Sequence, residues 1–418
     1  MNYAEPLSQR HPARMPLSPQ QHSHIAAAYD KAAFDISLPA HTRAAFAKKA
    51  DWFRLLAHHD TRLVTPLKII FLADTRPGHY HLAQGVIAAI ARLRPVEVTR
   101  IEVKRKWIVP TKWLRARINA KTFFPPRMLR MSYRIDAYTL PKADLVVSAG
   151  GETQMPNICV SRFLGGIPNI FCGSLLRGLG PENFSLVISS YERDATSPRH
   201  LVVLKPSAVD PDKLGRPAVV PRYGHGLHPR VAGLLIGGNA GPFRYKAEEW
   251  DRLLTFAAEV SRAWGTKWLV STSRRTSASV ADKIAALAKD DSVIARFIDY
   301  RTAGAGTLPE IFVKADVIVC TEDSSTMISE AVTARLPVVG VAPGAHRFTD
   351  DEQEYRDFMI ANGWCCVLPI AELTPDALAR ALSEIEPLRD NPLDALALKL
   401  KARLPQLFSA VESRAPIV

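Results

Sequence analysis

Residues 315–331 read Ala315-Asp316-Val-Ile-Val-Cys320-Thr321-Glu322-Asp323-Ser324-Ser325-Thr326-Met327-Ile328-Ser329-Glu330-Ala331. An apolar run typical of a buried strand passes through a short polar turn directly into a helical pattern. Hydroxyl groups and unpaired backbone N–H groups are therefore expected at a helix N-terminus, where the helix dipole favours anions. An ordinary helix cap gives the same pattern, so this stretch does not establish an anion site by itself.

The same alternation of strand, turn and helix begins at residue 67 and continues to about residue 385. Near-continuous apolar strands alternating with helices are typical of parallel sheets that helices cover on both faces. A stretch rich in Pro and Gly, residues 205–229, interrupts the alternation and predicts a link between two domains. We therefore predict an α/β protein of two Rossmann-like domains that face each other across a cleft. The predicted parts are an N-terminal arm and helix at 1–60, a first domain at 61–215, a second domain at 228–390, and a C-terminal helix at 391–418 that crosses back to the first domain.

The composition is that of a globular protein, with 47% hydrophobic and 23% charged residues in 418. No apolar run approaches the roughly 18–20 residues that span a bilayer, and residues 1–20 lack the apolar segment of a secretory signal. The five cysteines form no Cys-x-x-Cys pair, which favours buried free thiols in a reducing compartment. These features predict a cytoplasmic protein.

The net charge of +13 predicts an anionic partner. Lys and Arg concentrate in residues 92–134, where Glu97 and Glu102 are the only acidic residues. Trp, Phe and Tyr are interleaved with the basic residues of 104–134, a pattern that suits the headgroup region of an anionic membrane. The same pattern suits single-stranded nucleic acid, which we do not predict as the partner, and a solvated basic loop is a further interpretation.

Two more loops with phosphate-binding character follow strands of the second domain. Gly237-Gly238-Asn239 follows the first strand and lets backbone approach a phosphate closely. Ser273-Arg274-Arg275 follows the next strand, and its guanidinium groups suit bidentate phosphate contacts. Because parallel strands end at the same edge of a sheet, these loops and the turn at 323–326 are expected on one rim. The Gly-x-Gly-x-x-Gly motif, the P-loop motif and metal-ligand spacings are absent, so we predict neither a resident cofactor nor a metal site.

The order of these motifs, together with Asp74-Thr-Arg-Pro-Gly78-His79 near the start, resembles a known family across about residues 67–385. It is the family of mitochondrial-fission proteins named for elongated mitochondria in plants. That family is in turn similar to the GT-B glycosyltransferases, especially the membrane-associated transferase that adds N-acetylglucosamine to the lipid-linked peptidoglycan precursor. The resemblance therefore implies a GT-B fold and transfer of a sugar from a nucleoside diphosphate, with a UDP-sugar favoured as donor.

The resemblance also implies roles for particular residues. The diphosphate is expected at the start of the helix and uracil beside Ile298, while Glu330 is expected to hold the ribose. His79 is the first choice as general base because an imidazole titrates near neutrality, with Glu152 and Asp74 as rivals. The start of the helix comprises Asp323, Ser324, Ser325 and Thr326.

Transfer is expected to be inverting and independent of metal ions. The acceptor is expected to be lipid-linked or an envelope glycan, received by a protein bound peripherally to the inner face of the membrane through residues 104–134. Two alternatives remain open at this point. A sugar-nucleotide epimerase on the same fold would act without an acceptor. A non-catalytic membrane-associated scaffold would follow the role of the plant relatives in recruiting a fission dynamin.

Overall fold

The computed structural model describes residues 24–25, 27–29, 31–32, 42–50, 65–217, 220–223 and 226–408. The chain divides into two compact units, one of residues 1–65 and 408–418 and the other of residues 66–407. In the first unit, residues 42–50 are helical, and the rings of Tyr29 and Phe46 lie 5.8 Å apart. Most of the N-terminal arm and helix expected at 1–60 lies outside the described residues.

The second unit begins with an α/β domain, here called the N-domain. It is built on a six-stranded sheet in which neighbouring strands are parallel. The strand order is β2-β1-β3-β4-β5-β6, with Leu67 opposite Val96 and Ile69 opposite Leu145. Its strands are β1 (Leu67–Ala73), β2 (Val96–Glu102), β3 (Leu145–Ala149), β4 (Asn169–Cys172), β5 (Leu186–Ser189) and β6 (His200–Val202). Its helices are α3 (Pro77–Ala91), α4 (Thr111–Asn119), α5 (Pro125–Tyr133) and α6 (Gln154–Phe163).

A second parallel sheet of six strands forms the C-domain, in the order β12-β11-β10-β7-β8-β9. Its strands are β7 (Val231–Ile236), β8 (Lys267–Thr272), β9 (Ile294–Ile298), β10 (Val317–Thr321), β11 (Val338–Ala342) and β12 (Cys365–Pro369). The helices that follow are α7 (Ala247–Trp264), α8 (Ala278–Leu287), α9 (Tyr300–Ala303), α10 (Leu308–Lys314), α11 (Ser325–Thr333), α12 (Asp350–Ala361), α13 (Pro375–Glu384) and α14 (Pro392–Arg403). The predicted fold class is thus confirmed.

Apolar strands and the helices beside them form the cores of both sheets. Ile70, Val146 and Phe171 are fully or almost fully buried in the N-domain, as are Leu234 and Val319 in the C-domain. Each such side chain contributes about 1.5–3 kcal/mol relative to an exposed one. The five cysteines are free, and four of them are buried as expected.

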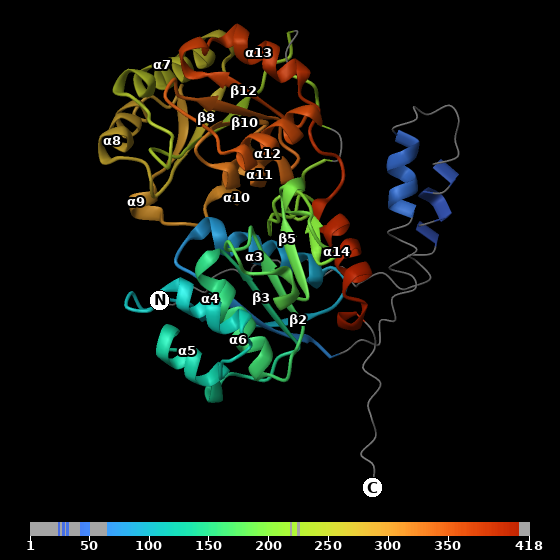
Figure 1. Ribbon diagram of the computed structural model, residues 1–418. Coiled ribbons are helices and arrows are strands. Elements are labelled where there is room, and N and C mark those ends of the chain that lie inside the picture. Colours follow the sequence, from blue (N-terminus) through green and yellow to red (C-terminus); the bar gives the residue numbers. More distant parts are fainter. Residues whose placement is uncertain are drawn as a thin grey trace, which may run out of the picture. The chain divides into compact units, whose positions relative to one another are not determined.

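The last helix leaves the C-domain and packs on the N-domain (Figure 1, red). Arg92, just after α3, donates from Nε to Asp394 of α14 at 2.6 Å and from a terminal nitrogen to Asp210 at 3.0 Å. Asn391 donates to Asp210 and to Asp212 at 2.9 Å each. Asp210 and Asp212 therefore connect the segment between the domains, residues 205–229, with the end of α3 and the start of α14.

Candidate functional site

A cavity of about 460 Å³ lies between the two domains, at the carboxyl ends of their strands. The turn after β1 and helix α3 supply its N-domain wall. The loops after β8 and β9 and the start of α11 supply its C-domain wall, and residues 207–209 of the interdomain segment complete it. Open α/β sheets bind ligands at this edge, so the position of the cavity alone makes it the leading candidate site.

On the N-domain side, His79 lies 2.6 Å from Asp74, measured from Nδ1 to Oδ2. Asp74 is buried, and its other oxygen accepts the N–H of Arg76 at 3.0 Å. An ionised carboxylate only accepts hydrogen bonds, so His79 carries its hydrogen on Nδ1 and keeps Nε2 as an acceptor. Because His79 also lines the cavity, Asp74 orients an imidazole that can accept a proton there.

The backbone at Gly150 fixes this pair from the other side. A Cβ at Gly150 would lie 2.2 Å from His79 Nδ1 and 2.9 Å from Asp74 Oδ2, and the glycine has a φ of +89°. Glu152, the rival base, follows in the same loop but does not line the cavity. Its carboxylate is 43% exposed and lies 3.5 Å from Arg105. The structure thus brings Asp74 and His79 together and leaves Glu152 apart from them.

On the C-domain side, Ser324 and Thr326 line the cavity at the start of α11. Ser324 is the N-cap residue, yet its side chain makes no capping hydrogen bond. The first N–H groups of a helix have no acceptor within the helix, so this end presents unpaired donors and the positive end of the dipole. Ser325 does not line the cavity, and its hydroxyl accepts instead from Lys205 and Arg356 behind the helix.

The Asp323 side chain is completely buried and holds neighbouring loops together. It accepts from Arg275 Nε at 2.9 Å, from the Gly238 N–H at 3.1 Å and from the Tyr245 hydroxyl at 3.1 Å, and it forms an ion pair with the Arg275 guanidinium at 2.7 Å. A Cβ at Gly237 would lie 2.1 Å from the same carboxylate. These contacts hold the loops after β7, β8 and β10 in fixed positions, through Asp323, Arg275, Gly237 and Gly238.

Two predicted contacts with nucleotide have other surroundings in the structure. Asn239 accepts from the Tyr245 N–H at 2.8 Å and does not line the cavity. Ile298 is buried in the C-domain core, and Tyr300, two residues later, lines the cavity instead. Ser273 does line the cavity, and its hydroxyl accepts from the Arg275 N–H at 3.2 Å.

Two exposed arginines line the cavity from opposite domains, Arg76 after β1 and Arg274 after β8. Neither guanidinium has a hydrogen-bond or ion-pair partner among the residues that the structure describes. Unpaired guanidinium groups beside a helix N-terminus can bind phosphate oxygens in bidentate fashion. Across the described ranges, no three His, Cys, Asp or Glu side chains gather so that they could hold a metal ion.

The two walls also touch each other. The Glu330 carboxylate contacts the imidazole of His81 on α3, at 2.9 Å between Oε1 and Nδ1. A Cβ at Gly78 would lie 3.3 Å from the Thr326 hydroxyl, so the first turns of α3 and α11 face each other closely. Glu330, the expected ribose ligand, thus lines the cavity but is engaged by the opposite domain.

Sequence reasoning missed several residues of the cavity. His81 and Gln84 lie on α3 soon after the quoted Asp74–His79 turn, so they could have been found by extending that motif one helical turn. The loop at 304–309 contains Gly304 and Gly306, both with positive φ, and its Gly-Ala-Gly sequence was a usable signal. The part played by residues 207–209 had no sequence signal, because it depends on how the linking segment folds back.

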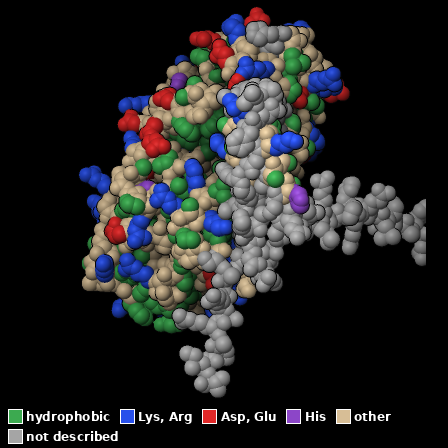
Figure 2. Space-filling model, turned by 90° about the vertical axis from the view of Figure 1, so that its right-hand side faces the viewer, with side chains coloured by type: hydrophobic (Ala, Val, Ile, Leu, Met, Phe, Trp, Pro, Cys, Tyr) green, Lys and Arg blue, Asp and Glu red, His purple; other side chains and the backbone are tan. Residues whose placement is uncertain are grey.

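Residues 104–134 form a basic and apolar surface that includes α4 and α5. Trp107 is 90% exposed, Ile108 is 63% exposed and Phe124 is 61% exposed. The N-domain half of the face in Figure 2 carries more Lys and Arg than Asp and Glu side chains. Within the described part of the chain, no helix is long and apolar enough to cross a membrane.

Solved structures similar to this one include proteins that handle nucleotide sugars. A Listeria monocytogenes protein assigned as a UDP-N-acetylglucosamine 2-epimerase is 12% identical, with 82% of this chain and 98% of that chain covered and a TM-score of 0.50. S. aureus MnaA, solved with UDP, is 13% identical, with coverage of 82% and 97% and a TM-score of 0.47. Acinetobacter baumannii MurG is 12% identical, with coverage of 81% and 100% and a TM-score of 0.42. At these identities the likeness concerns the fold alone.

Comparison of the sequence with curated proteins gives no match. The family model of mitochondrial fission ELM1 matches residues 77–395, which include the turn at His79, the C-domain rim and the beginning of α14. This range exceeds half of the chain and agrees with the resemblance that the motifs carried. The chain therefore belongs to the mitochondrial fission ELM1 family.

Proposed function

We propose that this protein is a GT-B-type glycosyltransferase that takes a sugar from a nucleoside diphosphate donor, with a UDP-sugar favoured. The observation that carries the proposal is the composition of the cavity. An imidazole oriented by a buried carboxylate, His79 with Asp74, lines the same cavity as the uncapped start of α11 and the unpaired Arg274. A general base and an anion site in one cavity are the two parts that sugar transfer from a diphosphate requires.

The proposed step is a single displacement. His79 Nε2 takes the proton of an acceptor hydroxyl as its oxygen attacks the anomeric carbon. The bond between that carbon and the diphosphate oxygen breaks, the electron pair stays with the diphosphate, and the configuration inverts. The first-turn amides of α11, Arg274 and Arg76 stabilise the charge on the leaving diphosphate, so the step is proposed to need no metal ion.

The proposed acceptor is a lipid-linked or envelope glycan. The surface of residues 104–134 belongs to the N-domain, the domain that also carries the proposed base. Exposed Trp107 and Ile108 beside Lys104 and Lys106 suit insertion at an anionic headgroup layer. We propose that the protein works peripherally at such a surface, on the cytoplasmic side of the membrane.

Turnover of a panel of UDP-, GDP- and ADP-sugars tests the function, with and without a lipid extract as acceptor and with EDTA present. Release of nucleoside diphosphate that requires the acceptor supports a transferase. It should fall at least 100-fold in His79→Ala, while diphosphate affinity stays within about threefold, or roughly 0.7 kcal/mol. Sugar isomerisation without acceptor would identify an epimerase. If the protein neither turns over nor binds any of these nucleotides, that result would favour the scaffold.

A further inference from the structure

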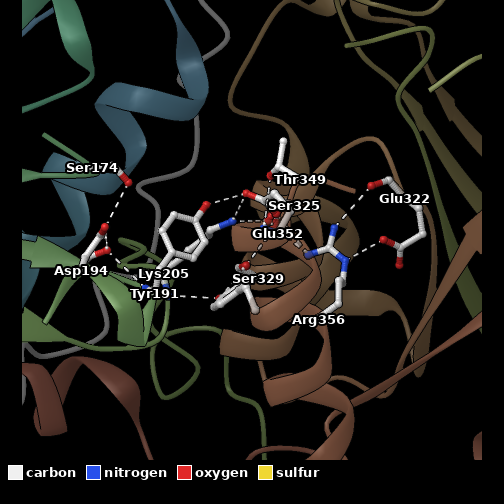
Figure 3. Close-up of polar contacts among 12 residues, drawn as sticks. Ser174, Tyr191, Asp194, Lys205, Glu322, Ser325, Ser329, Thr349, Glu352 and Arg356 are labelled. Atoms are coloured by element: carbon white, nitrogen blue, oxygen red, sulfur yellow. Dashed lines mark hydrogen bonds and ion pairs between the residues drawn. The ribbon is translucent and has the colours of Figure 1, made fainter. Parts of the chain in front are cut away.

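A buried ion network lies beside the start of α11 (Figure 3). Its charged members are two cations, Lys205 and Arg356, and two carboxylates, Glu322 and Glu352. Lys205 Nζ donates to Glu352 at 2.8 Å, and Arg356 Nε donates to Glu322 at 2.6 Å. The function proposed above does not use this network, because none of these four residues lines the cavity.

Lys205 comes from the segment between the domains, where its side chain is only 10% exposed. Its ammonium lies 4.2 Å from the ring centre of Tyr355 and 5.4 Å from that of Tyr191. Burial lowers the pKa of Lys205 to about 8, although Glu352 favours its charged form. An ammonium held this deeply needs partners on every side, and the network provides them.

The two cations meet at Ser325, the first residue of α11. Lys205 Nζ and Arg356 Nη1 both donate to the Ser325 hydroxyl, and Figure 3 shows Ser325 between them. Arg356 is itself fixed, because it is 1% exposed and bonded to Glu322. A Cβ at Gly340 would lie 1.8 Å from the Glu322 carboxylate, so that carboxylate packs directly on β11. Ser325 is thus anchored between Ser324 and Thr326, which face the cavity.

The N-domain supplies part of this anchor. Tyr191, after β5, donates its hydroxyl to Glu352 at 2.6 Å, on the same oxygen that accepts from Lys205. Arg193 pairs with Asp351 at the start of α12, beside Glu352. The Lys205 backbone N–H also donates to the Tyr355 hydroxyl at 3.1 Å. The full set of contacts on Ser325 therefore forms only while the N-domain, the segment and α12 are docked together.

We propose that Lys205 is a positioning residue that couples the docking of the two domains to the anion-binding first turn of α11. It holds Ser325, and through the backbone it sets the direction of the N–H groups that face the cavity. The inference rests on the proposed function only in taking the bound anion to be the donor diphosphate. Loss of Lys205 leaves Ser325 with one anchor, on the C-domain, and frees the first turn of α11 from the segment.

Two measurements on Lys205→Met test the proposal, with Lys213→Met as the matched control. Lys213 lies in the same segment and is 82% exposed, and its ammonium is 4.0 Å from Asp210. Calorimetric titration with inorganic pyrophosphate should show at least tenfold weaker binding in K205M and a change below twofold in K213M. Hydrogen exchange of amides 328–333 in the ligand-free protein should be at least threefold faster in K205M and unchanged in K213M. Lys205→Arg, which keeps the charge, should recover part of the affinity.

A second variant protects the test against a K205M protein that fails to fold. Tyr191→Phe keeps the ring and Lys205 but removes the hydroxyl that donates to Glu352, so it should shift both readouts in the same direction by a smaller factor. Unchanged exchange and affinity in K205M, or in Y191F where K205M does not fold, would overturn the proposal. Pyrophosphate binding without nucleotide-sugar turnover overturns only the proposed function. Absence of pyrophosphate binding to the natural protein overturns both.

Discussion

His81 of the N-domain and Glu330 of the C-domain lie 2.9 Å apart, across the cavity that separates their sheets. The Glu330 side chain is 9% exposed and the His81 side chain is 27% exposed, so this contact is partly shielded from water. Glu330 lies on α11 five residues after Ser325, in a position where its carboxylate could accept hydrogen bonds from the hydroxyl groups of a ribose. In the structure that position is already engaged by His81, and a nucleotide must displace the imidazole to use it.

We therefore expect His81→Ala to raise affinity for a nucleoside diphosphate by about three- to tenfold. The gain corresponds to roughly 0.7–1.4 kcal/mol, comparable with an exposed or partly exposed ion pair. Glu330→Ala should instead weaken binding, because it removes the carboxylate that we propose to hold the ribose. Calorimetric titration of UDP into the three proteins checks this. Weaker binding in H81A would mean that His81 contacts the nucleotide rather than competing with it.

The close approach of Gly150 to the His79–Asp74 pair gives a second prediction, with its control in the next residue. Gly150→Ala places a methyl group 2.2 Å from His79 Nδ1 and imposes a side chain at a φ of +89°. We expect a loss of about 1–3 kcal/mol of stability and at least tenfold slower sugar transfer. Gly151→Ala should be tolerated, because its methyl group would meet only Leu176, at 3.7 Å. Equal transfer rates in the two variants would contradict the placement of the base.

Membrane association should depend on the exposed tip of the 104–134 surface. Trp107→Ser should reduce co-sedimentation with vesicles containing 30% anionic lipid by about threefold or more, because it removes a fully available interfacial side chain. Val313→Ser is the control, since Val313 is a half-exposed apolar residue on α10 of the C-domain. Binding should also weaken at 0.5 M salt, where charge attraction is screened. Equal loss in both variants, or equal binding to neutral vesicles, would argue against this surface.

The stability of the fold at acid pH should depend on the buried network, because protonation of Glu352 weakens it. Burial alone would raise the pKa of Glu352, but the Lys205 ammonium and the hydrogen bonds from Lys205 and Tyr191 outweigh it and lower the pKa to about 2. A carboxyl whose folded pKa is lowered stabilises the fold above its unfolded pKa and loses that contribution as pH falls toward the folded value. Stability should therefore drop between about pH 4.5 and pH 2, by an amount on the order of 3 kcal/mol. In Glu352→Gln, denaturant unfolding should show a smaller drop; an identical drop would refute the assignment.

Much of the fold was predictable because its central strands are strongly apolar. The runs at β1, β3, β7 and β10 are buried on both faces, and their patterns identified them. The edge strands β6 and β12 were not predicted. β6 has only three residues after a Ser-Pro-Arg turn, and β12, although apolar, ends at Pro369, a residue that disfavours a strand assignment. Helices α4 and α5 were read only as a basic stretch, because their buried residues are interspersed with Lys and Arg.

The site was predictable as a set of loops but not as a set of contacts. The turn at His79, the loop at Arg274 and the start of α11 do line one cavity. Whether Arg274 or Arg275 is free could not be read from the sequence, because the answer depends on Asp323, a residue 48 positions further on that binds Arg275. The pairing of Glu330 with His81 joins residues 249 positions apart and likewise follows only from the docking of the domains.

Calorimetric titration of UDP, in EDTA, most directly tests whether the cavity binds a nucleoside diphosphate. The titration uses the natural protein, Arg274→Ala and Arg296→Ala. Arg296 is an exposed arginine on β9 that pairs with Glu310 and does not line the cavity, so its variant removes the same charge elsewhere in the domain. We predict binding to the natural protein, a loss of at least tenfold in R274A, which is about 1.4 kcal/mol, and little change in R296A. Absence of UDP binding, or equal affinity in all three proteins, would contradict the assignment of the cavity as a nucleoside diphosphate site.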